Sequence, residues 1–315
     1  MSDKMKIAIL GAGNIGTLIG AKLSKLPHTE VFLHARGDHA AAIAVNGIKI
    51  EGVEELTVEP REYHISIADV KTNSVFDGKA DIIFICSKAS DVGELLKFSR
   101  RLVHSETLII ILSNGLGHIE QASVEFGSHR IIPATTTHGA WRKNPGLIEW
   151  AGIGTINLGK MSNSPSRQQI SEIYSLIEDS GLNPVWIDDG DKLIWSKVLI
   201  NIAINPIASI TGRANGELLD PEMFETCSEV MLEGAKVARL EGVSLPDDEE
   251  LIQSLRLVLQ QTRENKCSML QDVRNGRVTE IGFLNRMIVN KAEKYGLFTP
   301  LNQLLSKLVE DLTSY

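Results

Sequence analysis

Residues 7–16 read Ile7-Ala8-Ile9-Leu10-Gly11-Ala12-Gly13-Asn14-Ile15-Gly16, and this stretch decides the fold of the 315-residue chain. A short apolar run leads into the glycine pattern GxGxxG, and a helical stretch follows from Thr17 to Lys25. In such strand–turn–helix units the first glycine permits a tight turn, the second lets a pyrophosphate approach the backbone, and the third allows close helix packing. A bare structural turn is the alternative, but it would not require this context. We therefore expect a dinucleotide to bind the loop through Gly11, Ala12, Gly13, Asn14, Ile15 and Gly16.

The end of the next predicted strand indicates which dinucleotide is bound. An NAD enzyme usually places a carboxylate there for the ribose hydroxyls, whereas this chain has Arg36, whose guanidinium suits a 2′-phosphate. Asp38 is the competing candidate for NAD, although its place beyond the strand end is typical of a solvated turn. Arg36 as an ordinary surface arginine is the other alternative. The sequence favours NADP, in its reduced form NADPH.

Short β-branched runs alternate with helix-like stretches through the first half of the chain. Several of these runs are apolar at consecutive positions, as expected of parallel strands that are covered on both faces. We expect two further strands, hinged at Gly152, to add antiparallel to the sheet edge, and a helix from Arg167 to Asp179. The predicted strands are Lys6–Leu10, Glu30–His34, Asp81–Cys86, Thr107–Leu112, Arg130–Ala134, Leu147–Ala151 and Gly154–Leu158.

Strand-like runs end near Asp188, and helical periodicity continues to Leu312. The chain is therefore expected to be an α/β protein. It would comprise a Rossmann-type doubly wound sheet domain, residues 1–187, followed by an all-helical domain, residues 188–315.

Composition excludes several classes of protein. Hydrophobic residues make up 43% and charged residues 23% of the chain, as in ordinary globular proteins, and we expect no apolar segment long enough to cross a bilayer. The net charge of −8 is spread along the chain, which argues against a nucleic-acid-binding surface. Cys86, Cys227 and Cys267 lack metal-ligand or disulfide spacing, so we expect reduced thiols and no metal. The N-terminus resembles no secretory signal, which predicts a cytoplasmic protein.

A lysine and two asparagines interrupt an otherwise apolar helical segment. Lys197, Asn201 and Asn205 are spaced i, i+4, i+8, so they lie on one stripe that spans about 12 Å of helix. An ammonium and two amides set among apolar residues cost free energy unless they are hydrogen-bonded, which favours a polar-lined cleft over a solvated stripe. Partial desolvation brings the pKa of a lysine nearer to neutral pH, as suits a proton donor.

With these residues in place, the chain resembles the ketopantoate reductase family, also called 2-dehydropantoate 2-reductase, over essentially its whole length. Several separate motifs in the right order carry the resemblance, which makes it specific. They are the glycine loop, Ser87-Lys88-Ala89, Ser113-Asn114-Gly115-Leu116-Gly117 with Glu120, Thr136-Thr137-His138, the helix with Lys197, Asn201, Asn205 and Pro206, Asn215-Gly216-Glu217-Leu218, Ser268-Met269-Leu270-Gln271-Asp272 and Thr279-Glu280-Ile281.

The resemblance implies roles for the residues of the second half. Lys197 would be the general acid that protonates the carbonyl oxygen of a 2-oxo acid while NADPH delivers hydride to C2. Ser268 would bind the substrate carboxylate, and Asn201, Asn205 and Asn215 would hold its carbonyl and hydroxyl end. The alternatives are a turn residue for Asn215 and a small helix-packing residue for Ser268.

The resemblance also implies that Glu280 binds the nicotinamide ribose, and that Lys88 and Asn114 sit where cofactor and substrate meet. Lys88 and Asn114 follow apolar strands at the edge where such sheets bind ligands. Their alternative is a chance surface position, and that of Glu280 is a solvated carboxylate. Asp91 and Gly282 depart from the family pattern of glutamine and aspartate, which affects the expected substrate preference and local packing.

The function that the resemblance implies is NADPH-dependent reduction of 2-dehydropantoate to pantoate, toward pantothenate and coenzyme A. The nearest alternative is a paralogous reductase of another small 2-oxo acid. A β-hydroxyacid dehydrogenase is disfavoured because no glycine run precedes Lys197. A non-catalytic NADP sensor would not need the polar groups of the second half. A homodimer through the helical domain is compatible with the sequence, and we expect hinge closure on ligand binding.

Overall fold

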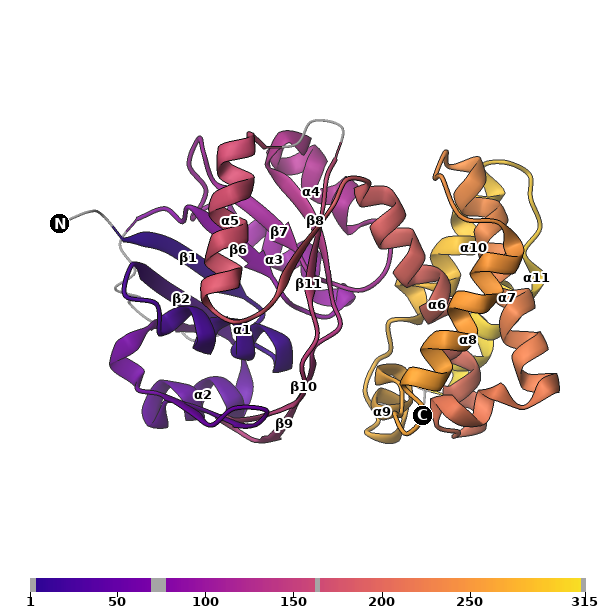
Figure 1. The fold of residues 1–315 in the computed structure, drawn as a ribbon, viewed down its shortest axis with the longest axis horizontal. Helices are drawn as coiled ribbons and strands as arrows, with labels where there is room; N and C mark the ends of the chain where they lie inside the picture. The colour runs from indigo at the N-terminus through magenta and orange to yellow at the C-terminus, as the bar shows by residue number, and fades with distance from the viewer. Residues whose placement is uncertain (1–3, 69–77, 162–164, 313–315) are drawn as a thin grey trace. The chain divides into compact units, whose positions relative to one another are not determined.

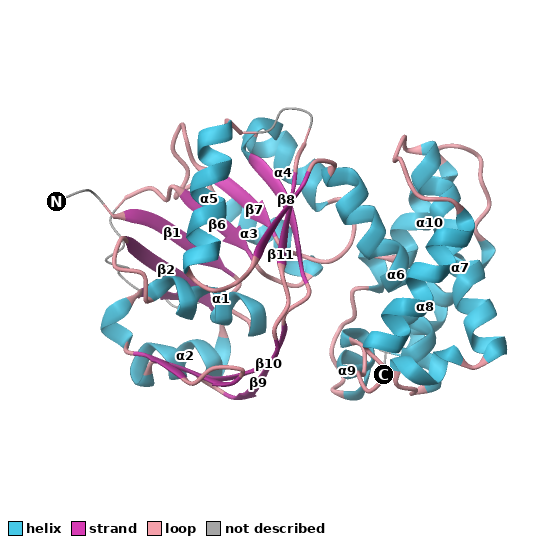
Figure 2. Ribbon diagram, in the orientation of Figure 1, coloured by secondary structure: helices cyan, strands magenta, loops and turns pink. Residues whose placement is uncertain are grey.

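The structure is a computed structural model, which describes residues 4–68, 78–161 and 165–312. The first residues of the N-terminus, on which the expectation of no secretory signal partly rests, lie outside the described residues. The chain divides into two compact units, one of residues 1–113 and 118–193 and the other of residues 114–117 and 194–315. Figures 1 and 2 show the first unit as a sheet with helices and the second as a group of helices.

An eight-stranded sheet forms the first unit. Its order is β12-β11-β8-β7-β6-β1-β2-β5, and every pair is parallel except β11 with β8. The six strands β5-β2-β1-β6-β7-β8 have the 3-2-1-4-5-6 order of doubly wound nucleotide-binding folds, which confirms the predicted fold class. The strands are β1 (Met5–Leu10), β2 (Thr29–Ala35), β5 (His64–Ile67), β6 (Ile82–Ile85), β7 (Leu108–Ile111), β8 (Ile131–Thr136), β11 (Ile156–Gly159) and β12 (Pro184–Ile187).

Consecutive apolar residues in the strands feed two separate cores. Ile7 and Ile9 of β1 belong to one core cluster, whereas Ala8 and Leu10 belong to another, because successive side chains of a strand point to opposite faces. Helices α1 (Asn14–Ser24) and α5 (Arg167–Asp179) contribute to the first cluster, and α3 (Val92–Ser99) and α4 (His118–Phe126) to the second. Figure 1 shows these two helix pairs on opposite faces of the sheet.

A second sheet of four strands, in the order β4-β3-β10-β9, was not predicted. The expected strand at 147–151 is present as β10, but it pairs parallel with β3 and antiparallel with β9, so its predicted place at the edge of the main sheet is wrong. Only the following strand, β11, joins the main sheet. Periodicity identifies a strand but not its partner, so the sequence could not show whether this strand joins the main sheet or a second one. The strands are β3 (Ile48–Gly52), β4 (Leu56–Val58), β9 (Gly139–Asn144) and β10 (Leu147–Gly152), and α2 (Gly37–Asn46) precedes them.

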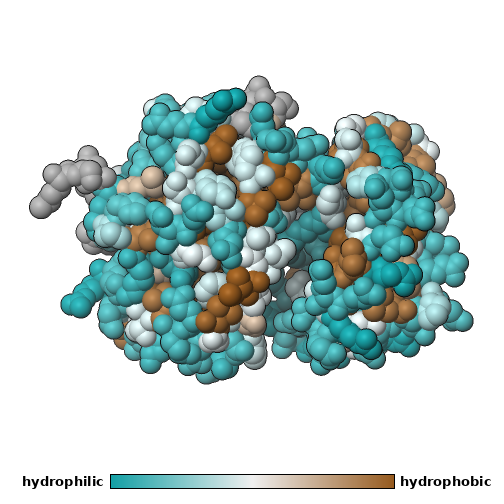
Figure 3. All heavy atoms as spheres, in the orientation of Figure 1, coloured by the Kyte–Doolittle hydropathy of each residue, from teal (hydrophilic) through white to brown (hydrophobic). Residues whose placement is uncertain are grey.

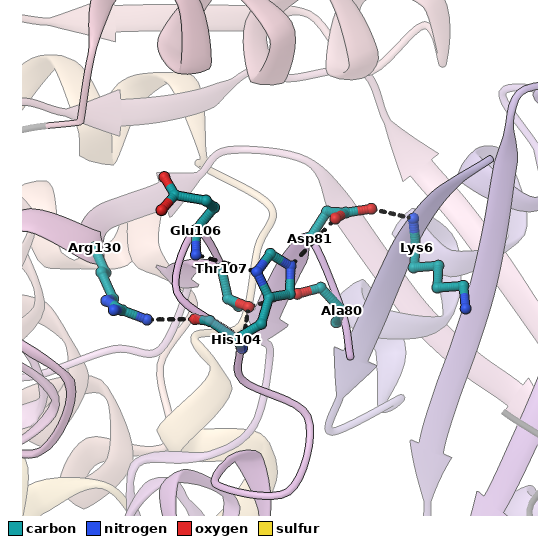
Figure 4. A network of polar contacts seen from close by, with 7 residues as sticks. All are labelled: Lys6, Ala80, Asp81, His104, Glu106, Thr107 and Arg130. Atoms are coloured by element: carbon teal, nitrogen blue, oxygen red, sulfur yellow. Dashed lines mark hydrogen bonds and ion pairs between the residues drawn. The ribbon is translucent and has the colours of Figure 1, made fainter. Parts of the chain in front are cut away.

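A polar network ties together the amino-terminal ends of the main strands (Figure 4). The Asp81 carboxylate accepts a hydrogen bond from the backbone N–H of Lys6 at 2.8 Å and lies 3.3 Å from Nε2 of His104. The backbone N–H of His104 donates to Thr107 Oγ1 at 2.8 Å, and its carbonyl accepts from Arg130. These residues lie in or next to β1, β6, β7 and β8, so the network secures the edge opposite the glycine loop.

The second unit is helical, as predicted. Its longest helix, α6, begins in the first unit and continues into the second. There it contributes many side chains to the core, including Val198, Leu199, Ile202 and Ala203. The other elements are η4 (Asn215–Leu219), α7 (Pro221–Leu240), α8 (Asp248–Gln261), α9 (Ser268–Arg274), η5 (Ile281–Phe283), α10 (Asn285–Glu293) and α11 (Pro300–Leu312), and α6 spans Gly190–Thr211.

The expectation that no segment is long and apolar enough to cross a bilayer is wrong for α6. This helix has 22 residues with a mean hydropathy of 1.5 over its most apolar window, and 67% of that window is buried inside the protein. A helix surrounded by other helices needs the same apolar surface as a helix in lipid, so composition alone does not distinguish the two. One such helix is weak evidence of a membrane span, and hydrophilic residues cover most of the face seen in Figure 3.

A proline inside α6 is compensated by an asparagine from another helix. Pro206 has no N–H, so the carbonyl of Ile202, four residues earlier, loses its helical donor. Nδ2 of Asn285, which is fully buried at the start of α10, donates to that carbonyl at 3.1 Å and to Oδ1 of Asn302 at 2.9 Å. Asn285 therefore stabilises α6 between the two asparagines of the predicted site.

Replacing Asn285 with leucine, which is similar in size, should destabilise the protein by about 2–4 kcal/mol, because two buried acceptors lose their donor. Urea unfolding followed by tryptophan fluorescence measures this change. Asn290→Leu on the exposed face of the same helix is the control and should change stability by less than about 0.5 kcal/mol. Equal effects of the two substitutions would contradict the role given to Asn285.

Candidate functional site

The glycine loop lies at the carboxyl edge of the main sheet, between β1 and α1. Gly11 has φ +90°, and a Cβ there would lie 2.9 Å from the backbone nitrogen of Ser87, which follows β6. A Cβ at Gly16 would meet the carbonyl of Gly11 and come within 3.1 Å of Cys86 Cβ. Both positions therefore require glycine for close packing of loop, helix and strand.

Gly13 differs from the other two glycines, because a Cβ there would meet nothing nearer than the Gly11 carbonyl at 4.0 Å. Gly13 and Asn14 are exposed, and no side chain caps the first amides of α1. Open space above backbone amides at a helix N-terminus suits an anionic group such as a pyrophosphate. The loop residues present here therefore fit a dinucleotide.

The buried side chains of His39 and Thr17 support the glycine loop through hydrogen bonds. The backbone N–H of Gly146 donates to Nδ1 of His39 at 3.0 Å, so the proton of the neutral ring is on Nε2, which lies 2.9 Å from Thr17 Oγ1. Thr17 in turn donates to the carbonyl of Ala12 at 3.0 Å. Burial, together with the positive charge of Arg142, lowers the pKa of His39 to about 4, which keeps the ring neutral at physiological pH.

Arg36 lies where the sequence predicts it, directly after β2. Its side chain is 69% exposed, and its guanidinium forms an ion pair of 2.8 Å with Asp91, at the start of α3. Asp38, the competing candidate for NAD, is exposed in the first turn of α2. The structure thus places a cation at the predicted 2′-phosphate position, with a carboxylate already beside it.

Lys88 is half-buried just after β6, on the same edge as the glycine loop. Ser113, which follows β7, donates to the carbonyl of Ser87 at 2.9 Å, and this bond joins the ends of β6 and β7. Lys88 therefore shares an edge with the loop, as expected of residues that follow neighbouring parallel strands.

In the second unit, Lys197, Asn201 and Asn205 all lie in α6, so the predicted helical stripe is present. Lys197 and Asn201 are half-buried and Asn205 is buried. Burial lowers the pKa of Lys197 to about 8, and the negative charge of Glu280 acts in the opposite direction. An amine with this pKa exchanges its proton near neutral pH, as a general acid requires.

Asn114 and Glu280 are brought together although 166 positions separate them. Nδ2 of Asn114 donates to the Glu280 carboxylate at 3.1 Å, and the backbone N–H of Leu116 donates to the carbonyl of Phe283 at 3.0 Å. Residues 114–117 therefore belong to the second unit. Lys197, Glu280 and Asn114 form one polar group within it.

Asn215 and Ser268 are linked through the segment between α8 and α9. Nδ2 of Asn215 donates to Thr262 Oγ1 at 2.9 Å, and its backbone N–H donates to the carbonyl of Asn265. Oδ1 of Asn215 is buried without a partner among the described residues, as suits a group that awaits a ligand. Ser268 is exposed at the start of α9.

Cys267, the residue before Ser268, connects α9 to α6, because its Sγ lies 3.7 Å from the carbonyl of Asn205. The start of α9 therefore lies against the stripe of α6. The described contacts thus join Asn205 to the Ser268 segment and that segment to Asn215.

Sequence reasoning missed the residues that support the site. Thr17, His39, Thr262 and Asn285 act through hydrogen bonds to distant parts of the chain, and no local pattern marks such partners. His138, which had no predicted role, is buried, accepts from the Gly154 backbone and lies 3.0 Å from the Leu182 carbonyl. Burial lowers its pKa, so it is a neutral structural histidine.

Within the described parts of the chain, no group of three or more His, Cys, Asp or Glu residues could hold a metal ion. Cys86, Cys227 and Cys267 form no disulfide. The candidate residues are thus a glycine loop followed by an arginine in the first unit and, in the second, a lysine near the Glu280 carboxylate, to which Asn114 donates.

A nucleotide-binding sheet of this order, followed by a helical unit, is the architecture of Rossmann-type dehydrogenases. Residues 7–163 match the family described as ketopantoate reductase PanE/ApbA, and residues 189–313 match its C-terminal domain. The chain belongs to this family of pyridine-nucleotide oxidoreductases, as the resemblance predicted.

Curated relatives agree over nearly the full length. The 2-dehydropantoate 2-reductase of Pyrococcus horikoshii is 34% identical over 97% of both chains, and that of Archaeoglobus fulgidus is 31% identical over 98% of both.

Solved structures agree as well. A ternary structure of D-mandelate dehydrogenase with NADH and anilino(oxo)acetate has a TM-score of 0.87 at 26% identity, covering 98% of both chains. The 2-dehydropantoate 2-reductase of Geobacter metallireducens has a TM-score of 0.86 at 25% identity, covering 98% of this chain and 99% of that one.

Thr17→Val should weaken dinucleotide binding about three- to tenfold, because the Ala12 carbonyl loses its donor and the loop loses its support. A fluorescence titration with the reduced dinucleotide measures the affinity, and kcat at saturating cofactor should stay within about twofold. Ser24→Ala removes a similar side-chain bond at the far end of α1 and serves as the control. Equal affinities of the two variants would refute a positioning role for Thr17.

Glu280→Gln should shift the pH dependence of catalysis. A general acid must be protonated, so kcat/KM for a ketone should fall as pH rises through the pKa of Lys197, about 8. Because the charge of Glu280 raises that pKa, its removal should move the falling limb to lower pH, while the Gln oxygen can still accept from Asn114. Profiles at saturating cofactor test this, with the exposed Glu225→Gln of α7 as control. An unchanged limb in Glu280→Gln would rule out the coupling.

Proposed function

We propose that this protein reduces 2-dehydropantoate to pantoate with NADPH, a step toward pantothenate and coenzyme A. The observation that carries the proposal is the amine of Lys197, which has a pKa of about 8 and sits on an apolar helix beside Glu280. The names of the curated relatives support the substrate. The division into an NADP-binding domain of residues 1–187 and a substrate domain of residues 188–315 is part of the same proposal.

NADPH, when bound, supplies the hydride that C2 of the 2-oxo acid receives. Gly11, Ala12, Gly13, Asn14, Ile15 and Gly16 would hold its pyrophosphate, Arg36 its 2′-phosphate, Glu280 its nicotinamide ribose, and Lys88 with Asn114 the region nearest the substrate. Arg36 lies at the end of β2, where a guanidinium favours the phosphorylated cofactor.

Lys197 donates the proton that the carbonyl oxygen needs as the hydride arrives, so that ketone, hydride and proton give the alcohol. Proton donation by a positioned side chain contributes about 10²- to 10⁴-fold to the rate. Asn201, Asn205 and Asn215 orient the carbonyl and hydroxyl end by hydrogen bonds, and Ser268 binds the carboxylate. The unpartnered Oδ1 of Asn215 supports this assignment.

The second candidate is a reductase of another 2-oxo acid on the same scaffold. D-Mandelate dehydrogenase, whose structure contains NADH and anilino(oxo)acetate, shares the fold over 98% of both chains. Its name indicates a 2-hydroxy acid other than pantoate as substrate. The chemistry of Lys197 would be the same, so only the substrate separates the two candidates. The homodimer and the cytoplasmic location stay predictions.

A panel of 2-oxo acids tests the function. Oxidation of NADPH should be fastest, by kcat/KM, with 2-dehydropantoate rather than with pyruvate, 2-oxobutanoate, 2-oxoisovalerate or phenylglyoxylate. Lys197→Met should lower kcat about 10²- to 10⁴-fold, yet leave the unfolding temperature unchanged or raised, because a buried amine costs stability.

Lys192→Met, an exposed position on the same helix, is the matched control and should keep full activity. A preference for another 2-oxo acid would favour the second candidate. Binding of NADPH without turnover of any acid would indicate a non-catalytic sensor.

A further inference from the structure

The arginine that we assign to the 2′-phosphate already has an anionic partner. Nη2 of Arg36 lies 2.8 Å from Oδ2 of Asp91, and within the described residues this is the only ion pair of Arg36. Asp91 follows Lys88 by three positions and occupies the N-cap position of α3, whereas Arg36 occupies that of α2; neither side chain makes a capping hydrogen bond. The two residues therefore come from segments that follow β6 and β2, the two neighbours of β1 in the sheet.

Asp91 is the better fixed of the two partners. Its side chain is 25% exposed and its Oδ1 accepts a hydrogen bond from Ser90 Oγ at 3.2 Å, while the side chain of Arg36 is 69% exposed. When a ligand competes for the pair, the arginine is thus the group that reorients, and the carboxylate stays in place near the ligand.

We propose that Asp91 is a specificity-determining residue for the cofactor, one that limits how far the protein prefers NADPH over NADH. The inference rests on the proposed assignment of the 2′-phosphate to Arg36. A phosphate monoester carries a charge of about −1.5 to −2 at pH 7, so it must compete with Asp91 for the guanidinium and is repelled by the carboxylate.

NADH carries a hydroxyl in place of this phosphate, so it neither competes with Asp91 for the guanidinium nor is repelled by the carboxylate. With NADH bound, Arg36 keeps Asp91 as its counter-ion, so no charge is left uncompensated. The protein should therefore accept both dinucleotides, with a preference for NADPH that is smaller than Arg36 alone would give.

Asp91→Asn tests the inference, because it removes the charge and keeps the shape. NADPH should bind about three- to tenfold more tightly, as expected from the loss of an exposed ion pair and of like-charge repulsion, while the affinity for NADH changes less than about twofold. Fluorescence titrations with NADPH and NADH, and calorimetry with NADP⁺, measure binding without turnover. The difference between variant and wild type should shrink as salt is raised.

Two controls separate this inference from the proposed function. Glu94→Gln removes another exposed charge from the first turn of α3, and it should leave both affinities unchanged. Arg36→Gln should weaken NADPH binding alone, which tests the assignment of the 2′-phosphate.

Loss of NADPH affinity in Asp91→Asn, or equal changes for both cofactors, would overturn the role of Asp91 and leave the proposed function standing if Arg36→Gln behaves as expected. If Arg36→Gln changes neither affinity, the assignment of NADPH to Arg36 fails, and the role of Asp91 fails with it.

Discussion

Polar groups that leave water cost free energy unless they find a partner inside the protein, and this constraint shapes both units. In the first unit, His39 and Thr17 connect a backbone N–H of the turn between β9 and β10 to a backbone carbonyl of the glycine loop. In the second, Asn285 replaces the donor that Pro206 removes from α6. In each unit a buried polar side chain therefore fixes a segment of the candidate site, and apolar packing supplies the surroundings that make the bond necessary.

Burial and a nearby carboxylate act in opposite directions on the pKa of Lys197. Full compensation by a close carboxylate would hold the pKa of an amine high, whereas burial lowers the pKa of Lys197 to about 8 and the charge of Glu280 offsets only part of that effect. A lysine in this balance loses and regains its proton within the range of ordinary pH. Burial of the amine costs the helical unit some stability, and the same burial lowers the pKa on which the proposed proton transfer depends.

The sequence predicted the parts of the protein that depend on local patterns. The glycine loop, the predicted strands of the main sheet and the stripe of α6 follow from spacing, and the structure contains all of them. The second sheet escaped prediction because strand pairing between β3 and β10 is a long-range choice that alternation of side chains does not encode. Hydropathy also could not identify α6 as a core helix, because the sequence of a helix does not show whether protein or lipid surrounds it. The roles of the site residues came from resemblance, and they stay predictions.

Charges are the hardest feature to place from sequence, as Asp91 illustrates. At the sequence level, its departure from the family pattern was assigned to substrate preference and local packing. The structure instead puts it against Arg36, in the unit that carries the glycine loop. No periodicity links position 36 to position 91; only the order of strands, with β2 and β6 on either side of β1, brings them to one edge. A departure that has no visible partner along the chain therefore supplies the carboxylate that pairs with Arg36 in the folded protein.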